Sequence, residues 1–262
     1  MTWRFPRRLG LAILLVASRL AAQPAPQFAQ NIGGQLPLAA PLVDETGRTA
    51  PLGTWLGQRP VLLLFGYYNC PQLCSVLERS TVDTLRDLKP TVGRDFDVIY
   101  LSIDPADSPA EARRRRDEAV QIYGRPGSVA GWHYLTGRPE AVRAVADAAG
   151  FGYRYDLRSH WYMHPSGFVV VTPAGRVSRY FLGIDFPAEA AAAALRRAAA
   201  GRTGEPVFNL ILECFRGDGF AGRYGPLIWR ILEGAVGLTV VAVFGGIGWL
   251  LWRERTEGAA AQ

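Results

Sequence analysis

Two short, nearly uninterrupted apolar runs constrain the fold of this chain more than any other feature. Residues 60–67 and residues 96–103 are mostly large apolar side chains, and turn-forming residues bound both runs. This pattern is typical of strands buried on both faces, because a strand with one wet face alternates apolar and polar residues. Each run is followed by apolar residues at helical spacing. Strands alternating with helices predict parallel central strands with helices on both faces of a sheet.

Further elements complete this picture. Ser108, Pro109 and Glu111 have the spacing of a helix start, since serine caps, proline fits the first turn and glutamate lies three residues on. The other expected elements are a small hairpin around residues 44–48, a strand at 132–135, a helix at 140–149, a hairpin of 168–172 with 177–182, and an alanine-rich helix at 187–200. We therefore expect an α/β sandwich with a mixed sheet.

Composition narrows the class of protein. The 262 residues are 49% hydrophobic and 20% charged, enough to bury a sizeable core and too apolar for a disordered chain. The net charge is +6, but four arginines without a compensating acid lie within the first 22 residues. We therefore expect no nucleic-acid partner. Three cysteines are too few for a disulfide scaffold.

Both ends of the chain carry targeting patterns. Residues 1–22 combine a basic start with a short apolar stretch, which predicts a secretory signal peptide, the alternative being an uncleaved start. Residues 234–252 contain no charge, and Trp229, Trp249 and Trp252 flank them. We expect a transmembrane helix at 228–252 and a cytoplasmic tail at 253–262, the alternative being a buried soluble helix. Between these ends we expect an extended lead-in at 23–35, a domain at 36–202 and a juxtamembrane segment at 203–227.

Cys70 and Cys74 are the most informative pair of side chains. Pro71 suits a first helical position, so the first thiol lies at the rim of a helix and the second lies about one turn along. The helix dipole favours thiolate there, which makes such a pair nucleophilic, oxidisable and able to bind a metal. The alternative is a structural disulfide or two buried thiols.

His164 offers a third ligand, because it precedes the predicted hairpin strands and can lie beside the loop that follows the cysteine strand. Two thiolates and one imidazole suit copper, especially Cu(I), whereas a zinc site ordinarily takes a fourth protein ligand. The sequence does not exclude zinc. His160 and His133 are weaker candidates, since one lies in an exposed-looking stretch and the other inside a predicted strand.

The order of these motifs resembles the Sco/SenC family. The resemblance covers residues 36–200 and rests on the stretches 65–74, 101–105, 132–137 and 164–175. It implies a thioredoxin-like domain that binds copper at Cys70, Cys74 and His164. It also implies delivery of copper to the binuclear copper centre of cytochrome c oxidase, or reduction of that centre. Residues 179–186, together with Cys214 and the segment after it, resemble a bacterial branch anchored at its C-terminus.

The resemblance has departures. Many members have an aspartate immediately before the histidine, where this chain has Met163. Either the thioether lies near copper, or the carboxylate that orients the imidazole is missing. Asp104 ends a predicted strand and is either a second-shell carboxylate or a turn residue. Cys214 is the odd thiol, for which interchain pairing, a redox contact and simple burial all stay open.

Two functions follow from these residues. One is a metallochaperone, single-pass in the bacterial cytoplasmic membrane with its domain on the periplasmic side, that passes copper to the copper-accepting subunit of the oxidase. The other is a thiol–disulfide reductase in which Cys70 attacks a target disulfide and Cys74 resolves the product. His164 discriminates between them, since only a metal site requires it. Further partners of this kind would be thioredoxin-like reductants or other copper carriers.

Overall fold

The computed structural model describes residues 26–69, 73–184, 186–204, 233–240, 242–246 and 249 of the chain. At 73–76 it describes the helical backbone only. The chain divides into two units, Ala25–Val207 and a second unit made of Met1–Pro24 with Phe208–Gln262. The expected signal peptide, the cytoplasmic tail and Cys214 lie outside the described residues.

A five-stranded mixed sheet forms the centre of the larger unit. Its order is β5-β4-β3-β8-β9, where β3, β4 and β5 run parallel, β8 runs antiparallel to β3, and β9 runs antiparallel to β8. The bounds are β3 Val61–Gly66, β4 Asp97–Ser102, β5 Trp132–Leu135, β8 Gly167–Val171 and β9 Val177–Leu182. The expected mixed sheet is therefore confirmed.

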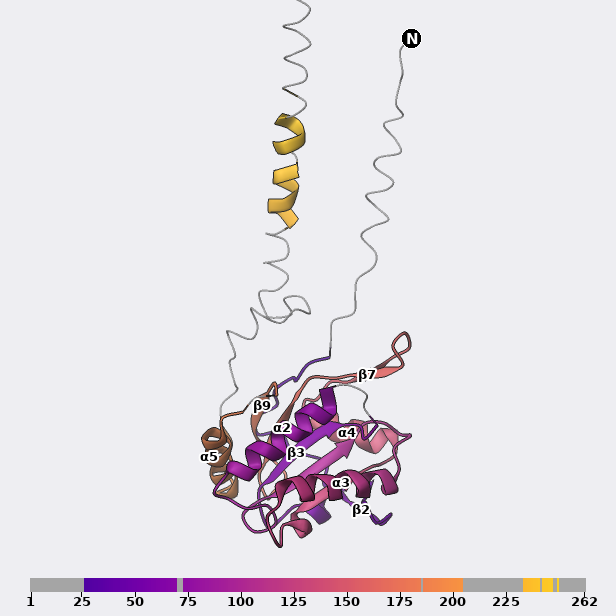
Figure 1. The fold of residues 1–262 in the computed structure, drawn as a ribbon, viewed down its shortest axis with the longest axis vertical. Coiled ribbons are helices and arrows are strands. Elements are labelled where there is room, and N and C mark those ends of the chain that lie inside the picture. Colours follow the sequence, from indigo (N-terminus) through magenta and orange to yellow (C-terminus); the bar gives the residue numbers. More distant parts are fainter. Residues whose placement is uncertain are drawn as a thin grey trace, which may run out of the picture. The chain divides into compact units, whose positions relative to one another are not determined.

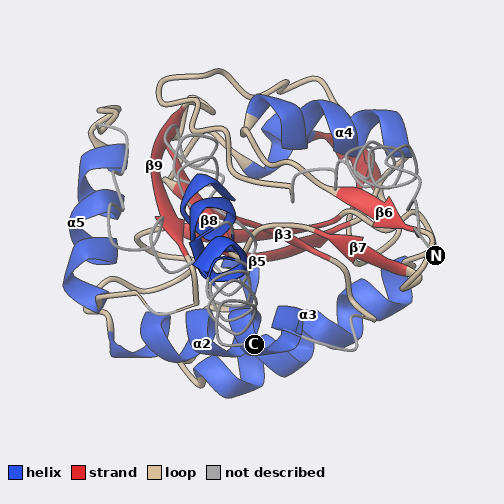
Figure 2. Ribbon diagram, turned by 90° about the horizontal axis from the view of Figure 1, so that it is seen from above, coloured by secondary structure: helices blue, strands red, loops and turns tan. Residues whose placement is uncertain are grey.

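Helices cover both faces of this sheet, as Figure 2 shows. One face packs against α2 (Leu73–Asp87), α3 (Pro109–Tyr123) and α5 (Ala188–Ala199), and the other packs against α4 (Pro139–Ala148). Alternate side chains of β3 point to opposite layers, so that Leu62 lies in the first core and Leu63 in the second. Every residue of β3 is buried, as expected of a central parallel strand.

The start of α3 has the predicted capping box. The Ser108 hydroxyl accepts a hydrogen bond from the Glu111 backbone N–H at 3.3 Å, and Glu111 Oε2 accepts one from the Ser108 N–H at 2.7 Å. Gly124, at φ 68°, ends the helix in the left-handed region that glycine adopts without strain. The helix therefore begins where the sequence predicts.

The N-terminal part of the larger unit covers the second face of the sheet. Strands β1 (Pro41–Val43) and β2 (Thr49–Pro51) form the expected hairpin, followed by the short helix η2 (Leu52–Trp55). The preceding residues also contact the body, since the Phe28 ring meets the Phe151 ring with centroids 5.2 Å apart. The described part of the expected lead-in, from residue 26 on, thus packs against the core through partly buried side chains.

A second hairpin, between α4 and β8, has no counterpart among the predicted elements. Strands β6 (Arg154–Asp156) and β7 (Trp161–Met163) pair antiparallel and extend from the body of the unit, as Figure 1 shows. Leu157, at the turn, is 79% exposed. Three residues on, His160 has φ 60°, the only non-glycine residue with positive φ in the described part of the chain.

The expected transmembrane helix at 228–252 is corrected by the structure. Among the residues described, no helix combines the length and the apolar character that crossing a membrane requires.

Candidate metal centre

The sheet brings the two predicted ligand segments to one edge. Strand β3 ends at Gly66, and its continuation leads through Tyr68 and Asn69 to Cys70. Strand β8 runs in the opposite direction and pairs Phe168 with Leu64, so the residues that precede β8 lie beyond the same end of β3. His164 is among them. The topology therefore confirms the predicted neighbourhood of the two loops.

The His164 ring lies against aromatic side chains at this edge. Its centroid is 6.2 Å from that of Tyr67 in an edge-to-face contact and 5.7 Å from that of Phe151. Tyr67 is three positions ahead of Cys70, so the imidazole lies close to the start of the cysteine loop. Tyr67 therefore packs beside the candidate site.

The protonation of His164 suits a metal ligand. Its Nδ1 lies 3.0 Å from the backbone carbonyl oxygen of Pro165. Because a carbonyl oxygen only accepts hydrogen bonds, Nδ1 is the donor, and in the neutral ring Nε2 carries the lone pair. Burial lowers the pKa of His164, which favours that neutral ring. The Pro165 carbonyl thus orients the imidazole, a task that a second-shell carboxylate often has.

The two cysteines are described less completely. Cys70 lies outside the described residues, and Cys74 lies in the first turn of α2 with only its backbone described. Among the residues described, no group of three or more histidine, cysteine, aspartate or glutamate side chains could hold a metal ion. The ligand set of Cys70, Cys74 and His164 therefore stays a prediction.

The two competing histidines lie elsewhere. His160 is exposed at the turn of the β6–β7 hairpin. His133 pairs in register with Ile99, which in turn pairs with Leu63, so it lies level with the middle of β3. Neither residue is at the end of β3 where the cysteine loop begins.

Met163 and Asp104 each have a local role. The Met163 sulfur accepts a hydrogen bond from Arg154 Nη2 at 3.7 Å, across the β6–β7 pair. Asp104 Oδ1 accepts one from the Ala106 backbone N–H at 2.9 Å, as a turn residue after a strand does. Asp104 also lies near Tyr67, whose pKa is raised mainly by burial and further by this negative charge.

Three residues that the sequence analysis did not single out for the site surround the start of the cysteine loop. Asn69 lies directly ahead of Cys70, and its amide Nδ2 donates to Glu111 Oε1 at 2.5 Å and to Asp107 Oδ1 at 3.4 Å. We call Asn69, Asp107 and Glu111 the Asn69 cluster. Strand order could have predicted this cluster. Residues 104–111 follow β4, the parallel neighbour of β3, so this segment and the cysteine loop leave the same edge of the sheet.

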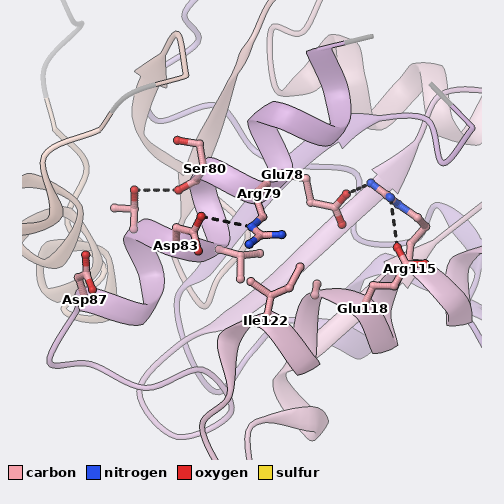
Figure 3. A pocket seen from close by; sticks show the side chains of 11 residues that line it. Glu78, Arg79, Ser80, Asp83, Asp87, Arg115, Glu118 and Ile122 are labelled. Carbon is pink, nitrogen blue, oxygen red and sulfur yellow. Dashed lines mark hydrogen bonds and ion pairs between the residues drawn. The ribbon is translucent and has the colours of Figure 1, made fainter. Parts of the chain in front are cut away.

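A pocket between α2 and α3 is separate from this edge. Figure 3 shows that several charged side chains lining it pair with one another, as Arg79 does with Asp83 at 3.4 Å and Arg115 does with Glu78. Glu78 also accepts a hydrogen bond from the Tyr134 hydroxyl at 2.5 Å. Among the residues described, His164 does not line the pocket. These contacts join α2 to α3 and the sheet.

Comparison with known proteins agrees with this fold. The family model described as SCO1/SenC matches residues 33–200. A protein from Aquifex aeolicus VF5, provisionally described as an electron transfer protein, is 27% identical with a TM-score of 0.57, over 65% of this chain and 95% of that chain. No curated protein sequence matches this chain.

Two further solved structures are more distant. Arabidopsis thaliana ScoI with copper bound is 18% identical with a TM-score of 0.51, over 65% of this chain and 99% of that chain. BsSco, described as having a disulfide switch and as a member of the Sco family of cytochrome c oxidase assembly proteins, is 20% identical with a TM-score of 0.50, over 66% and 99%. These likenesses confirm the expected thioredoxin-like α/β fold with a mixed sheet.

Proposed function

Because the chain belongs to the SCO1/SenC family, we propose that it is a copper metallochaperone for the assembly of cytochrome c oxidase. It binds one copper ion through the thiolates of Cys70 and Cys74 and the imidazole of His164. Its partner is the copper-accepting subunit of the oxidase. The domain acts outside the cytoplasm, where the basic, apolar start of the chain would direct it.

The observation that carries this proposal is the state of His164. A thiol–disulfide reductase has no need of an imidazole, yet this ring lies beside the residue three positions ahead of Cys70, with its centroid 6.2 Å from that of Tyr67. The Pro165 carbonyl oxygen accepts a hydrogen bond from Nδ1–H at 3.0 Å, so Nε2 is the nitrogen able to bind a metal. A neutral imidazole held in this way is a typical copper ligand.

The chemistry of transfer follows from the ligands. Two thiolates and one imidazole form a soft site of low coordination number, which suits Cu(I). A ligand from the client can then add to copper while one ligand of this protein leaves, and no electron is exchanged. The half-buried His164 lies at a sheet edge, where a partner can approach it.

The test is copper stoichiometry and affinity. The full chain is reduced, loaded anaerobically with Cu(I), and titrated against a coloured Cu(I) chelator, beside His164→Ala and His160→Ala. His160 is the matched control, because it is exposed at the hairpin turn only four residues earlier. We expect one copper per chain and at least about tenfold weaker binding in His164→Ala only, since loss of a ligand costs more than loss of its hydrogen-bond partner.

Other outcomes would change the proposal. Equal loss in both histidine variants would remove His164 from the ligand set. If the folded, reduced chain retained no copper, the proposal would fail, and thiol–disulfide exchange by Cys70 and Cys74 would become the better explanation. That reaction is then tested by trapping a mixed disulfide, which we expect in Cys74→Ser and not in Cys70→Ser.

A further inference from the structure

We propose that Asp107 and Glu111, at the start of α3, are positioning residues for Cys70. They hold the two residues ahead of it, Tyr68 and Asn69, through side-chain hydrogen bonds. The inference rests on the proposed function, because it concerns how that copper site is organised. It adds a structural link between the N-terminus of one helix and the loop that leads into another.

Asp107 is the buried member of the Asn69 cluster. Its Oδ2 accepts a hydrogen bond from the Tyr68 backbone N–H at 2.7 Å and one from the Ser102 hydroxyl at 2.6 Å. Its Oδ1 accepts the longer bond from Asn69 at 3.4 Å. Only 8% of this residue is exposed, and burial raises the pKa of its carboxyl. A largely buried side chain with these partners fixes the backbone at Tyr68.

Glu111 acts from the exposed side. Its Oε1 accepts from Asn69 at 2.5 Å, while its Oε2 accepts from the Ser108 backbone N–H at 2.7 Å. One carboxylate thus closes the capping box of α3 and ties down the residue that precedes Cys70. The hydrogen bond from Asn69 is also the largest cause of the lowered pKa of Glu111. At neutral pH this carboxylate is therefore charged and able to accept both bonds.

The placement of Asn69 matters for Cys70 because a ligand must be brought to its metal. A loop that is already ordered loses less conformational entropy on binding than a loop free to move. The same argument applies to the disulfide, which also requires Cys70 near Cys74. Loosening Asn69 should therefore weaken copper binding and the Cys70–Cys74 disulfide together.

Three single variants separate positioning from general stability. Asn69→Ala removes the hydrogen bonds that the Asn69 side chain donates to Asp107 and Glu111, and it leaves the α3 cap intact. Ser108→Ala weakens the cap but keeps the Asn69–Glu111 bond, so it is the matched control. Glu111→Ala removes both. The double variant Asn69→Ala with Glu111→Ala tests whether the two residues act through each other.

Two properties of the full chain are measured, with urea unfolding alongside. One is the Cu(I) dissociation constant by chelator competition. The other is the midpoint potential of the Cys70–Cys74 couple, in a Cys214→Ser background equilibrated with glutathione. We expect Asn69→Ala and Glu111→Ala each to weaken copper binding threefold to tenfold. The equilibrium constant for forming the disulfide should fall by a similar factor. A tenfold fall corresponds to a midpoint potential about 30 mV higher.

The controls decide the outcome. We expect Ser108→Ala to unfold at a lower urea concentration, with its midpoint potential and copper affinity unchanged. We expect the double variant to have the same midpoint potential and copper affinity as Glu111→Ala alone. Wild-type potential and affinity in folded Asn69→Ala, or equal shifts in Ser108→Ala, would overturn the proposal. If the wild-type chain binds no copper, the proposed function fails, whereas the midpoint potentials still test the positioning role.

Discussion

The two sides of the candidate site are built differently. On the cysteine side, the chain leaves a central strand and is held at once by the buried Asp107. On the histidine side, the chain arrives from the β6–β7 hairpin, which extends from the body and exposes 79% of Leu157 at its turn. Hydrogen bonds fix the first side, whereas aromatic packing and one carbonyl fix the second. The contrast shows that a residue following an exposed hairpin, here His164, can still be held in place by packing against the body of the unit.

Phe151 tests the histidine side and should give the largest effect. It is 1% exposed, stacks on Phe65 with centroids 4.6 Å apart, and also contacts the His164 ring. Phe151→Ala leaves a cavity under that ring, so we expect the free energy of unfolding to fall by about 4 kcal/mol. Urea unfolding measures this, with Tyr155→Ala as the exposed aromatic control. If the free energy of unfolding fell by less than about 1 kcal/mol in Phe151→Ala, packing on Phe151 would not be what holds His164, and the hairpin would hold it instead.

Arg115 tests the helix that carries Cys74. It pairs with Glu78, whose carboxyl has a raised pKa because burial outweighs the arginine charge. Arg115→Met leaves this carboxylate buried and without its cation. We expect a loss of about 3 kcal/mol near neutral pH, from the cost of breaking a buried ion pair.

The pH dependence of that loss identifies Glu78 as its cause. An acid whose pKa is raised in the folded state takes up a proton more readily there, so the folded state gains relative stability as pH falls. A neutral Glu78 needs no cation, and the loss in Arg115→Met should shrink between about pH 7 and about pH 5. Unfolding at both pH values, beside the exposed-pair variant Arg79→Met, measures this. A loss that is independent of pH would assign it to packing instead.

His160 tests the hairpin and should give the smallest effect. At φ 60° it occupies the left-handed region, which costs non-glycine residues roughly 1–2 kcal/mol. His160→Gly should therefore raise the free energy of unfolding by about 0.5 kcal/mol, after the greater freedom of glycine in the unfolded chain is counted. Leu157→Ser, at the same turn, should change stability by less than about 0.5 kcal/mol. Thermal unfolding measures both variants. If either one destabilises the protein, the side chain that it replaces makes stabilising contacts at this turn.

Much of the sheet could be predicted because its signals are local. Residues 61–66 form an apolar strand, and Ser108 and Glu111 cap a helix in the structure as they do in the sequence pattern. The β6–β7 hairpin escaped prediction because its three-residue strands are too short to show alternation and are mixed in polarity. The uncharged stretch 234–252 and its flanking tryptophans predict a transmembrane helix, which the structure corrects for the residues it describes.

The candidate site was predictable only in part, because only some of its contacts have a local sequence signal. Residue chemistry predicts His164 as a ligand, and the antiparallel pairing of β8 with β3 places this residue beyond the end of β3 where the cysteine loop begins. The hydrogen bond from Asn69 to Glu111, at 2.5 Å, joins a loop residue to the first turn of α3, and no local sequence pattern predicts such a contact. Likewise, the Pro165 carbonyl that orients His164 was not foreseen, because every residue has a carbonyl.

The antiparallel pairing of β8 with β3 also determines when the proposed site can exist during synthesis. A chain is made from its N-terminus, so Cys70 and Cys74 are present long before His164. Until β8 has been made and has paired with β3, a growing chain carries the dithiol without the imidazole. Such a chain can form a disulfide but cannot complete a three-ligand copper site, which makes full copper binding a property of the finished sheet.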